Sequence, residues 1–364
     1  MPTLFIDKDV LKNNIAITKS LSGEAHIIGV VKGNGYGLGL CSFARILVES
    51  GIETLAVTEL EDAVKLRNSG IHCDILMLSP LYQKEDIITA LNQYLILSIT
   101  SCECGEIAEQ TAAELNIYAR CQICVDTGLG RYGFTDNEKR DIIYTINQMK
   151  HLCVTGIYSH FYAASCKKSV HTVRQLERFT SLCDEIEQAN VFTGFRHIAA
   201  SCALLRYPEA KLDAVRIGSA FLGRLPFPDH LGYKPVGQLQ APIQDIRVLP
   251  PGTGLGYGHT YITSRQTTIA VISVGYAHGL GTRRYNSCPG LTHLPGYIFR
   301  MLKSILFPKK LYAYNGEKPL PILGKIGMNS TIIDITGTKL TIGDTVFIPV
   351  NPIYVDSSLP RQYS

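Results

Sequence analysis

A short apolar run near the N-terminus ends in a lysine and then enters a glycine-rich loop. The run is Ile27–Val31, the lysine is Lys32, and glycines occupy alternate positions from 33 to 39. A short β-branched run predicts a buried strand, and the glycines let the backbone take positive φ and approach a ligand closely. A lysine at the mouth of a buried strand loses its proton through desolvation, which makes its amine a nucleophile. Taken alone, Lys32 is equally compatible with a surface position before a flexible loop.

Apolar runs alternate with amphipathic stretches over the first 228 residues. Strands are expected at 27–31, 54–57, 75–78, 95–99, 117–125, 154–158, 196–199 and 213–217. Helical patterns lie between most of them, and the longest runs from Val170 to Asn190. Eight strand-then-helix units are what a (β/α)8 barrel requires. The sequence therefore predicts an α/β fold with a TIM-type barrel over residues 1–228.

Helical periodicity fades after residue 228. Runs rich in β-branched residues follow at 243–248, 267–274, 331–335 and 345–350, with frequent Gly and Pro between them. This pattern predicts a second, mostly β domain over residues 229–364. Residues 278–318 form an irregular insert rich in Arg, Pro and Tyr, with one amphipathic stretch at 297–306.

Composition limits the compartment and the partners. A net charge of +4 is too small to favour nucleic acid or a membrane surface. No apolar run reaches the roughly 20 residues that span a bilayer, and Asp7, Lys8 and Asp9 interrupt any signal peptide. We expect a cytoplasmic protein with reduced thiols. Cys121 and Cys124 have no second pair or nearby His to complete a metal site, so buried thiols are expected there.

Polar residues follow several of the expected strands. In a barrel, the residues just after each strand face the active site. The residues at these positions are Lys32, Arg131, His160, Ser201 and Arg216. Arginine offers a fixed fork of donors and a permanent charge, which suits it to hold anionic groups.

The segment from Lys32 to Gly39 resembles the cofactor-lysine motif of the alanine racemase family, whose members use pyridoxal phosphate. The resemblance implies that Lys32 carries this cofactor covalently and that Tyr36 binds its phosphate. Barrel-only proteins that bind pyridoxal phosphate and basic amino acid decarboxylases carry relatives of this motif.

Further segments match that family in the same chain order. Asp126–Arg131 resembles its fifth-strand motif, which implies that Arg131 contacts the cofactor's phenolic oxygen and the substrate carboxylate; pairing with Asp126 is the alternative. By the same resemblance Arg216 faces the pyridine nitrogen and His160 supports this arginine. The remaining phosphate contacts would come from Ser201, Gly218 and Ser219.

The second domain contains a candidate second base. Gly254–Tyr261 resembles the family segment in which a tyrosine faces the lysine across the substrate, and here that tyrosine is Tyr257. Racemisation needs one group on each face of Cα, which implies Lys32 on one face and Tyr257 on the other. A packed tyrosine in a Gly-rich turn is the alternative. In the family this tyrosine enters from the partner subunit, which implies a homodimer with shared active sites.

Two more segments complete the resemblance. Tyr276 matches an entry-channel tyrosine, and Met328 matches a residue whose backbone N–H meets the substrate carboxylate. The chain departs from the family pattern at substrate and entrance positions. Cys124 stands where many members have a carbamylated lysine, and Val350–Ser364 lacks a clear second phosphate tyrosine. The other departures are Ala200, His278, Gly327 and Asn329.

The resemblance implies a pyridoxal-phosphate-dependent racemase (an isomerase) that acts on alanine and supplies D-alanine for a bacterial cell wall. A serine racemase or a racemase of small amino acids in general is a close alternative. A related amino acid decarboxylase, usually a longer chain, is a second alternative. A non-catalytic protein that binds the cofactor is a third, but such proteins consist of the barrel alone.

Overall fold

The protein is described by a computed structural model, in which residues 1–166, 169–228, 230–282, 295–296, 298–299, 301–302 and 310–364 are described. It has two compact units, one of Lys8–Val236 and one of Met1–Asp7 together with Gly237–Ser364. The division falls at Val236 where the sequence suggested residue 228, and the first residues of the chain belong to the second unit. Most of the insert expected at 278–318, with its amphipathic stretch at 297–306, lies outside the described residues.

Parallel strands close into a barrel in the first unit. Within the described residues they are β2 (His26–Val30), β3 (Thr54–Val57), β4 (Asp74–Met77), β5 (Leu97–Ile99), β6 (Ala119–Asp126), β8 (Leu152–Tyr158), β9 (Phe195–His197) and β10 (Ala214–Ile217). They pair in the orders β10-β2-β3-β4 and β5-β6-β8-β9. Bridges from Leu76 to Ile96 and from Ala200 to Arg216 join the two sheets. The eight expected strands coincide with these elements, so the prediction of an α/β barrel is confirmed.

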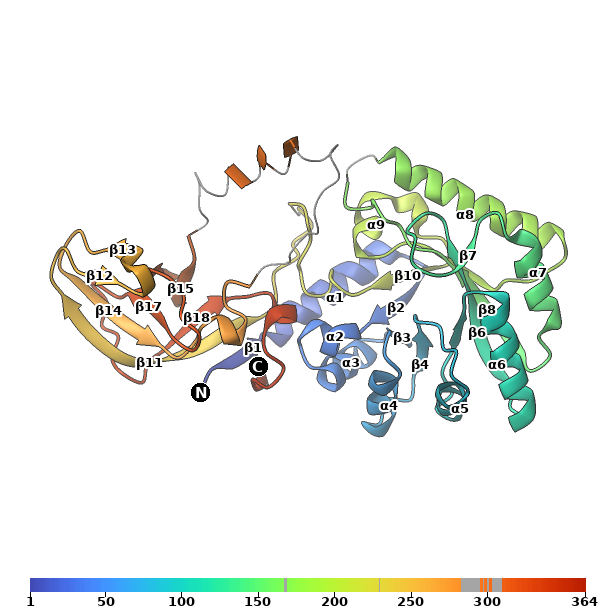
Figure 1. Cartoon of the computed structure of the whole chain (residues 1–364), viewed down its shortest axis with the longest axis horizontal. Coiled ribbons are helices and arrows are strands. Elements are labelled where there is room, and N and C mark those ends of the chain that lie inside the picture. The colour runs from blue at the N-terminus through green and yellow to red at the C-terminus, as the bar shows by residue number, and fades with distance from the viewer. Residues whose placement is uncertain (167–168, 229, 283–294, 297, 300, 303–309) are drawn as a thin grey trace. The chain divides into compact units, whose positions relative to one another are not determined.

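Helices flank the strands of the barrel (Figure 1). They are α1 (Lys8–Ser22), α3 (Leu40–Glu49), α4 (Leu60–Asn68), α5 (Lys84–Asn92), α6 (Cys102–Leu115), α7 (Lys139–Gln148), α8 (Val170–Gln188), α9 (Ser201–Arg206) and the 3-10 turn η1 (Pro208–Ala210). The segment labelled α2 (Lys32–Tyr36) is a tight turn with left-handed backbone inside it. A short strand, β7 (Phe134–Thr135), pairs with β6. In α8 the buried Phe179, Leu182 and Ile186 repeat at helical spacing, and Ser169 caps the first turn. This helix is the one expected from Val170 to Asn190.

The glycine-rich loop after β2 uses the freedom that glycine provides. Gly33, Asn34, Gly35 and Tyr36 all have φ between 53° and 63°, which is left-handed backbone. Asn34 tolerates this conformation and accepts a hydrogen bond from the Leu40 amide through Oδ1, at 2.9 Å. The chain therefore turns tightly at the end of β2, directly after Lys32.

The second unit is built on one large sheet. Its strand order is β14-β17-β16-β15-β18-β11-β1-β19, and β14 also pairs with β11. The strands are β1 (Thr3–Ile6), β11 (Gln238–Leu249), β14 (Thr267–Ile272), β15 (Tyr312–Asn315), β16 (Lys318–Leu323), β17 (Thr331–Asp334), β18 (Thr345–Pro349) and β19 (Arg361–Tyr363). Smaller elements are β12 (Gly254–Leu255), η2 (Tyr257–His259), β13 (Tyr261–Ile262), η3 (Tyr276–His278) and η5 (Pro352–Tyr354). A β-rich second domain was predicted and is confirmed.

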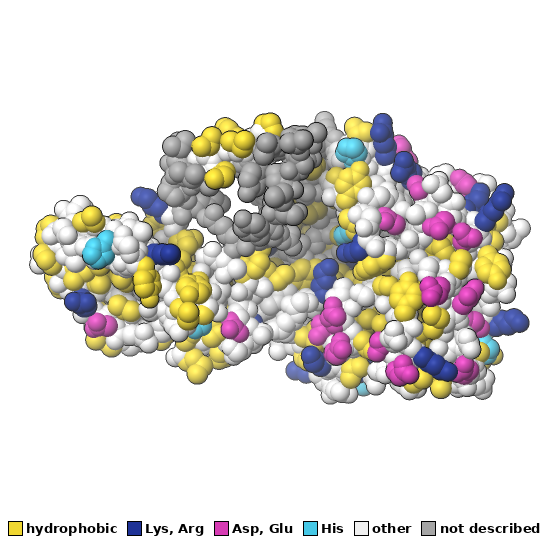
Figure 2. Space-filling model, viewed as in Figure 1, with side chains coloured by type: hydrophobic (Ala, Val, Ile, Leu, Met, Phe, Trp, Pro, Cys, Tyr) yellow, Lys and Arg dark blue, Asp and Glu magenta, His cyan; other side chains and the backbone are white. Residues whose placement is uncertain are grey.

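Both chain ends lie in this sheet, since β1 runs parallel to β19 and antiparallel to β11 (Figure 1). On the face of the first unit that Figure 2 displays, acidic and basic side chains are interspersed. Among the described helices, none is long and apolar enough to cross a lipid bilayer.

Asn14 ties the first helix of the barrel unit to the end of that unit. Its Nδ2 donates to the carbonyl oxygens of Phe221 and Lys234 at 2.9 and 2.8 Å, and its Oδ1 accepts from the Lys234 amide at 3.0 Å. The side chain is fully buried. Without it, buried backbone groups would lose their partners.

We expect Asn14→Ala to lower the free energy of unfolding by about 2–4 kcal/mol, because three buried hydrogen bonds are lost and their partners stay buried. The control is Asn13→Ala, which removes the same side chain from the adjacent exposed position on α1. Urea unfolding followed by circular dichroism measures the difference. Equal stability of the two variants would contradict this role for Asn14.

Candidate active site

A cavity of about 250 Å³ opens at the carboxyl ends of the barrel strands. Every site residue predicted in the first unit lies in its wall. These residues are Lys32, Tyr36, Arg131, His160, Ser201, Arg216, Gly218 and Ser219. Strands β2, β8 and β10 or the segments after them supply most of them, as the barrel rule requires. The volume is slightly below the usual range for ligand pockets, so a compact ligand fits best.

The cavity is cationic. Lys32, Arg131 and Arg216 contribute positive side chains, and no carboxylate is among the described residues that line it. Burial lowers the pKa of Lys32, and repulsion from Arg131 and Arg216 lowers it further. A larger fraction of the Lys32 amine is therefore unprotonated near neutral pH than in an ordinary lysine.

Arg216 is the buried cation of the site, with 4% of its surface exposed. Its Nη1 donates to Nδ1 of His197 at 2.6 Å and to the His197 carbonyl at 3.3 Å. Its Nη2 donates to the carbonyls of Ser159 and Ile198 and, at 3.2 Å, to Nδ1 of His160. Burial lowers the pKa of Arg216 to about 10, so the guanidinium stays charged near neutral pH.

The two histidines that accept from Arg216 are neutral. Burial and the charge of Arg216 lower the pKa of His160 to about 3 and that of His197 well below its ordinary value. All five acceptors are thus neutral groups, and among the described residues no carboxylate forms an ion pair with Arg216. The positive charge of Arg216 is therefore not neutralised by another side chain.

Small polar groups gather in another part of the wall, around Ser201 and Gly218. The Ser201 Oγ accepts from the amides of Gly218 and Ala220 at 3.3 and 3.2 Å. The Tyr36 ring lies against Gly218, where a Cβ atom would overlap the phenolic oxygen. Burial raises the pKa of Tyr36 to about 12, so its hydroxyl remains a neutral donor. A hydroxyl, a phenol and backbone amides in a cationic cavity fit a phosphate group.

Arg131 is not paired with Asp126. The Asp126 carboxylate accepts from the amides of Gly128, Leu129 and Gly130, each at 2.8 Å, and so shapes the loop itself. The Arg131 guanidinium lies 4.7 Å from the centre of the Tyr132 ring and remains exposed. The alternative, in which Arg131 pairs with Asp126, is therefore not found among the described residues.

Cys124 lies below this loop. Its Sγ donates to the Tyr132 carbonyl at 3.6 Å. Burial raises the pKa of Cys124 to about 11, so the thiol is neutral. It anchors the backbone beside Arg131 but supplies no negative charge. Cys121 is buried as well, and the described residues contain no cluster of metal ligands.

Some residues of the site are not evident in the sequence. His197 contacts Arg216 directly, and Gln122 contacts it through the His197 side chain. The sequence predicted neither residue. His197 ends a short strand, which is a position that the barrel rule could have selected. Gln122 lies in the middle of β6 and carries no such signal.

The second unit places its predicted residues on neighbouring loops. Tyr276 and Ala277 donate backbone hydrogen bonds to the carbonyls of Gly327 and Met328, each at 3.0 Å. Gly256, next to Tyr257, lies against the backbone of Lys325. Exposed fractions are 73% for Tyr257, 52% for Tyr276 and 56% for Met328. The three side chains are therefore exposed on adjoining segments of this unit.

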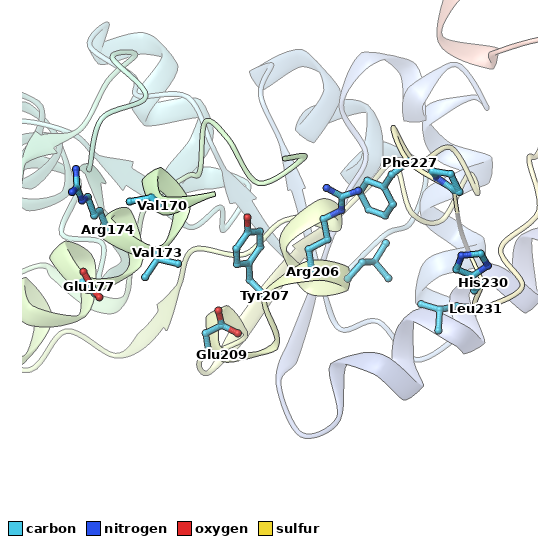
Figure 3. A pocket seen from close by; sticks show the side chains of 12 residues that line it. Val170, Val173, Arg174, Glu177, Arg206, Tyr207, Glu209, Phe227, His230 and Leu231 are labelled. Atoms are coloured by element: carbon cyan, nitrogen blue, oxygen red, sulfur yellow. The ribbon is translucent and has the colours of Figure 1, made fainter. Parts of the chain in front are cut away.

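A larger hollow of about 1000 Å³ lies elsewhere on the barrel unit, between the start of α8 and residues 227–228 and 230–231 (Figure 3). Here Arg206 reaches toward the Phe227 ring, with its guanidinium 3.7 Å from the ring centre. None of the predicted site residues line this hollow. The larger hollow therefore lacks the reactive side chains, and the smaller cavity that contains Lys32 is the candidate site.

A parallel (β/α)8 barrel with a lysine of lowered pKa after its first strand, followed by a β-rich domain, defines a two-domain class of α/β protein. The alanine racemase N-terminal domain model matches residues 6–226, and the alanine racemase C-terminal domain model matches residues 236–356. The chain belongs to the alanine racemase family.

Individual relatives agree with this assignment. The chain is 31% identical over 350 residues to alanine racemase 1 of Clostridium acetobutylicum, covering 94% of this chain and 84% of that one. It is 28% identical to alanine racemase of Methanococcus maripaludis, with 94% and 87% covered.

Solved structures give the same result for the fold. Alanine racemase of Clostridium difficile 630 superposes with a TM-score of 0.85 at 23% identity, covering 100% of this chain and 95% of that one. Alanine racemase of Bacillus anthracis with bound L-Ala-P superposes with a TM-score of 0.76 at 26% identity, with 95% and 85% covered.

We expect Arg131→Met to raise the pKa of Lys32, because one of the two repelling charges is removed while the burial of Lys32 is kept. Reductive methylation of the full-length protein without cofactor, read by mass spectrometry across pH, should reach half-completion at Lys32 at a higher pH.

Arg140→Met is the control, since it removes the same charge from an exposed position on α7 and should leave the profile unchanged. An identical pH profile for Arg131→Met and the unaltered protein would mean that Arg131 does not act on the amine.

Proposed function

We propose that this chain is a pyridoxal-phosphate-dependent racemase that interconverts L- and D-alanine by moving a proton at Cα between two bases. The observation that carries the proposal is the cavity in which Lys32 lies with two arginines and, among the lining residues that the structure describes, no carboxylate. Membership of the alanine racemase family supports the reaction type. Cytoplasmic D-alanine production for peptidoglycan is the role we infer.

The wall of the cavity suits the cofactor. Tyr36, Ser201, Gly218 and Ser219 would hold the phosphate through neutral donors, and Lys32 would hold the cofactor at its aldehyde carbon. When bound, pyridoxal phosphate supplies the electron sink that makes the Cα proton of an amino acid acidic.

Arg216 would face the ring nitrogen as a donor that gives up its proton with difficulty. His160 and His197, which contact Arg216, are neutral, so neither of them offers an acidic proton to the ring nitrogen. This environment limits electron withdrawal and so disfavours side reactions such as transamination.

Lys32 is suited to the first proton transfer. Once the substrate's amino group has replaced it at the aldehyde carbon of the cofactor, the lowered pKa of Lys32 would leave a free amine that can accept a proton from one face of Cα and return it in the reverse direction. Arg131, with no acidic partner among the described residues, is available for the substrate carboxylate.

Tyr257 would serve the opposite face from a second copy of the chain. Its exposure, with that of Tyr276 and Met328 on adjoining loops, supports the interpretation that a partner covers this surface. We propose a homodimer in which Tyr257 of the partner subunit completes each site, with Tyr276 at the entrance and Met328 at the substrate carboxylate.

The test is a chiral assay on purified protein with a panel of L-amino acids. L-alanine should approach an equal mixture of L and D forms faster than any other substrate. Faster conversion of serine would favour the broader alternative, and release of carbon dioxide would favour the decarboxylase. No D-amino acid from any substrate would overturn the proposal.

We expect Tyr257→Phe to keep the absorbance of the bound cofactor and to lower turnover by a factor of about 100 or more, because it removes a general base. Steady-state kinetics with L- and D-alanine measure the loss. Tyr312→Phe, the same change on β15 of the same unit, is the control. Equal turnover in both variants would remove Tyr257 from the mechanism.

A further inference from the structure

Three buried side chains from three different barrel strands form one line of hydrogen bonds. Nε2 of His197 on β9 lies 2.9 Å from Oε1 of Gln122 on β6. Nδ1 of the same ring lies 2.6 Å from Nη1 of Arg216 on β10. Exposed fractions are 5% for Gln122, 0% for His197 and 4% for Arg216. Water therefore does not substitute for any of these contacts.

The positions of the protons in this line follow from which groups can donate and which can accept a hydrogen bond. A guanidinium can only donate, so Nδ1 of His197 must accept from Arg216. A neutral imidazole carries its one proton on the other nitrogen, so Nε2 of His197 must donate. The group that faces Nε2 must then be an acceptor, which is the carbonyl oxygen of the Gln122 amide and not its NH₂ group.

The fold makes room for this amide. A Cβ atom at Gly156 on β8 would lie 2.9 Å from both Cδ and Nε2 of Gln122, so any other residue there would displace the amide. The His197 ring is held from one face as well, because Tyr158 stacks on it with ring centres 5.1 Å apart. The ring is therefore positioned by two hydrogen bonds and one stacked neighbour.

We propose that Gln122 is a positioning residue: as the neutral acceptor for Nε2–H, its amide holds His197 in the orientation and tautomer in which Nδ1 accepts from the Arg216 guanidinium. An amide accepts a hydrogen bond but brings no charge. A carboxylate at the same place would favour a second proton on the imidazole, and that proton would point at Arg216. The effect of Gln122 on catalysis rests on the proposed function, whereas the tautomer of His197 does not depend on it.

Other titratable groups face this line and enter its pH dependence. From the strands packed against His197 these are Tyr158 on β8, His160 just after it, Cys124 on β6, His26 on β2 and Arg216 on β10. None is an acid that is charged near neutral pH. A carboxylate introduced at position 122 would therefore be the one negative charge in direct contact with the ring.

The tautomer is measured by ¹⁵N NMR of histidine in the full-length, cofactor-loaded protein, with His197 assigned through its contact with the Tyr158 ring. We expect a protonated shift at Nε2 and an unprotonated shift at Nδ1, both constant between about pH 6 and pH 9. The Nδ1–H tautomer, or a mixture of the two, would overturn the proposal.

Two substitutions test whether Gln122 is the cause. Gln122→Leu leaves the buried Nε2–H of His197 without an acceptor, so the Nε2 shift should change and turnover should fall about tenfold, the factor for one buried hydrogen bond. Gln122→Glu should make Nδ1 of His197 titrate within the measured range. Gln188→Glu, an equal change of charge at an exposed position of α8, should alter neither.

Unchanged His197 shifts in both Gln122 variants would refute the role of Gln122, whatever the turnover. If the protein proves not to be a racemase, the shifts still decide the proposal. The proposed racemase activity and the proposed role of Gln122 can therefore be contradicted independently of each other.

Discussion

The hydrogen bonding of one buried arginine determines much of this molecule's chemistry. Arg216 is held by two imidazole nitrogens and three backbone carbonyls, none of which carries charge. A buried cation without a counter-ion is costly unless its hydrogen bonds are satisfied. The barrel meets this requirement by bringing the ends of β8, β9 and β10 together around the guanidinium. The result is a positive centre whose charge acts on the cavity.

The other features of the cavity follow from that charge. Together with burial and Arg131, it lowers the pKa of Lys32 and so raises the unprotonated fraction of the amine near neutral pH. It also helps to keep His160 neutral. The cationic wall and the neutral donors around Ser201 make the cavity attractive to an anionic cofactor. Arg216, His160 and Lys32 therefore act as one electrostatic unit, although they come from distant parts of the chain.

The barrel could be predicted because its strands are buried on both faces and read as short apolar runs. Five cavity residues of the first unit followed from one geometric rule, since parallel strands end at the same edge. Tyr36, Gly218 and Ser219 followed only from the resemblance to the family. His197 and Gln122 were missed because a mid-strand glutamine has no sequence signal and its role depends on partners about 75 positions away. In the second unit β16 contains two prolines, which weaken a strand pattern. The placement of β1 beside β19 depends on long-range pairing, which local periodicity does not encode.

Among the described lysines, Lys32 is the one that lines the cationic cavity, and we propose that it reacts with the cofactor's aldehyde. Borohydride reduction of the cofactor-loaded protein, followed by peptide mass spectrometry, tests it directly. We predict that the reduced cofactor is found on the peptide that contains Lys32 and on no other lysine. Stoichiometric labelling of a different lysine, with Lys32 unmodified, would contradict the account.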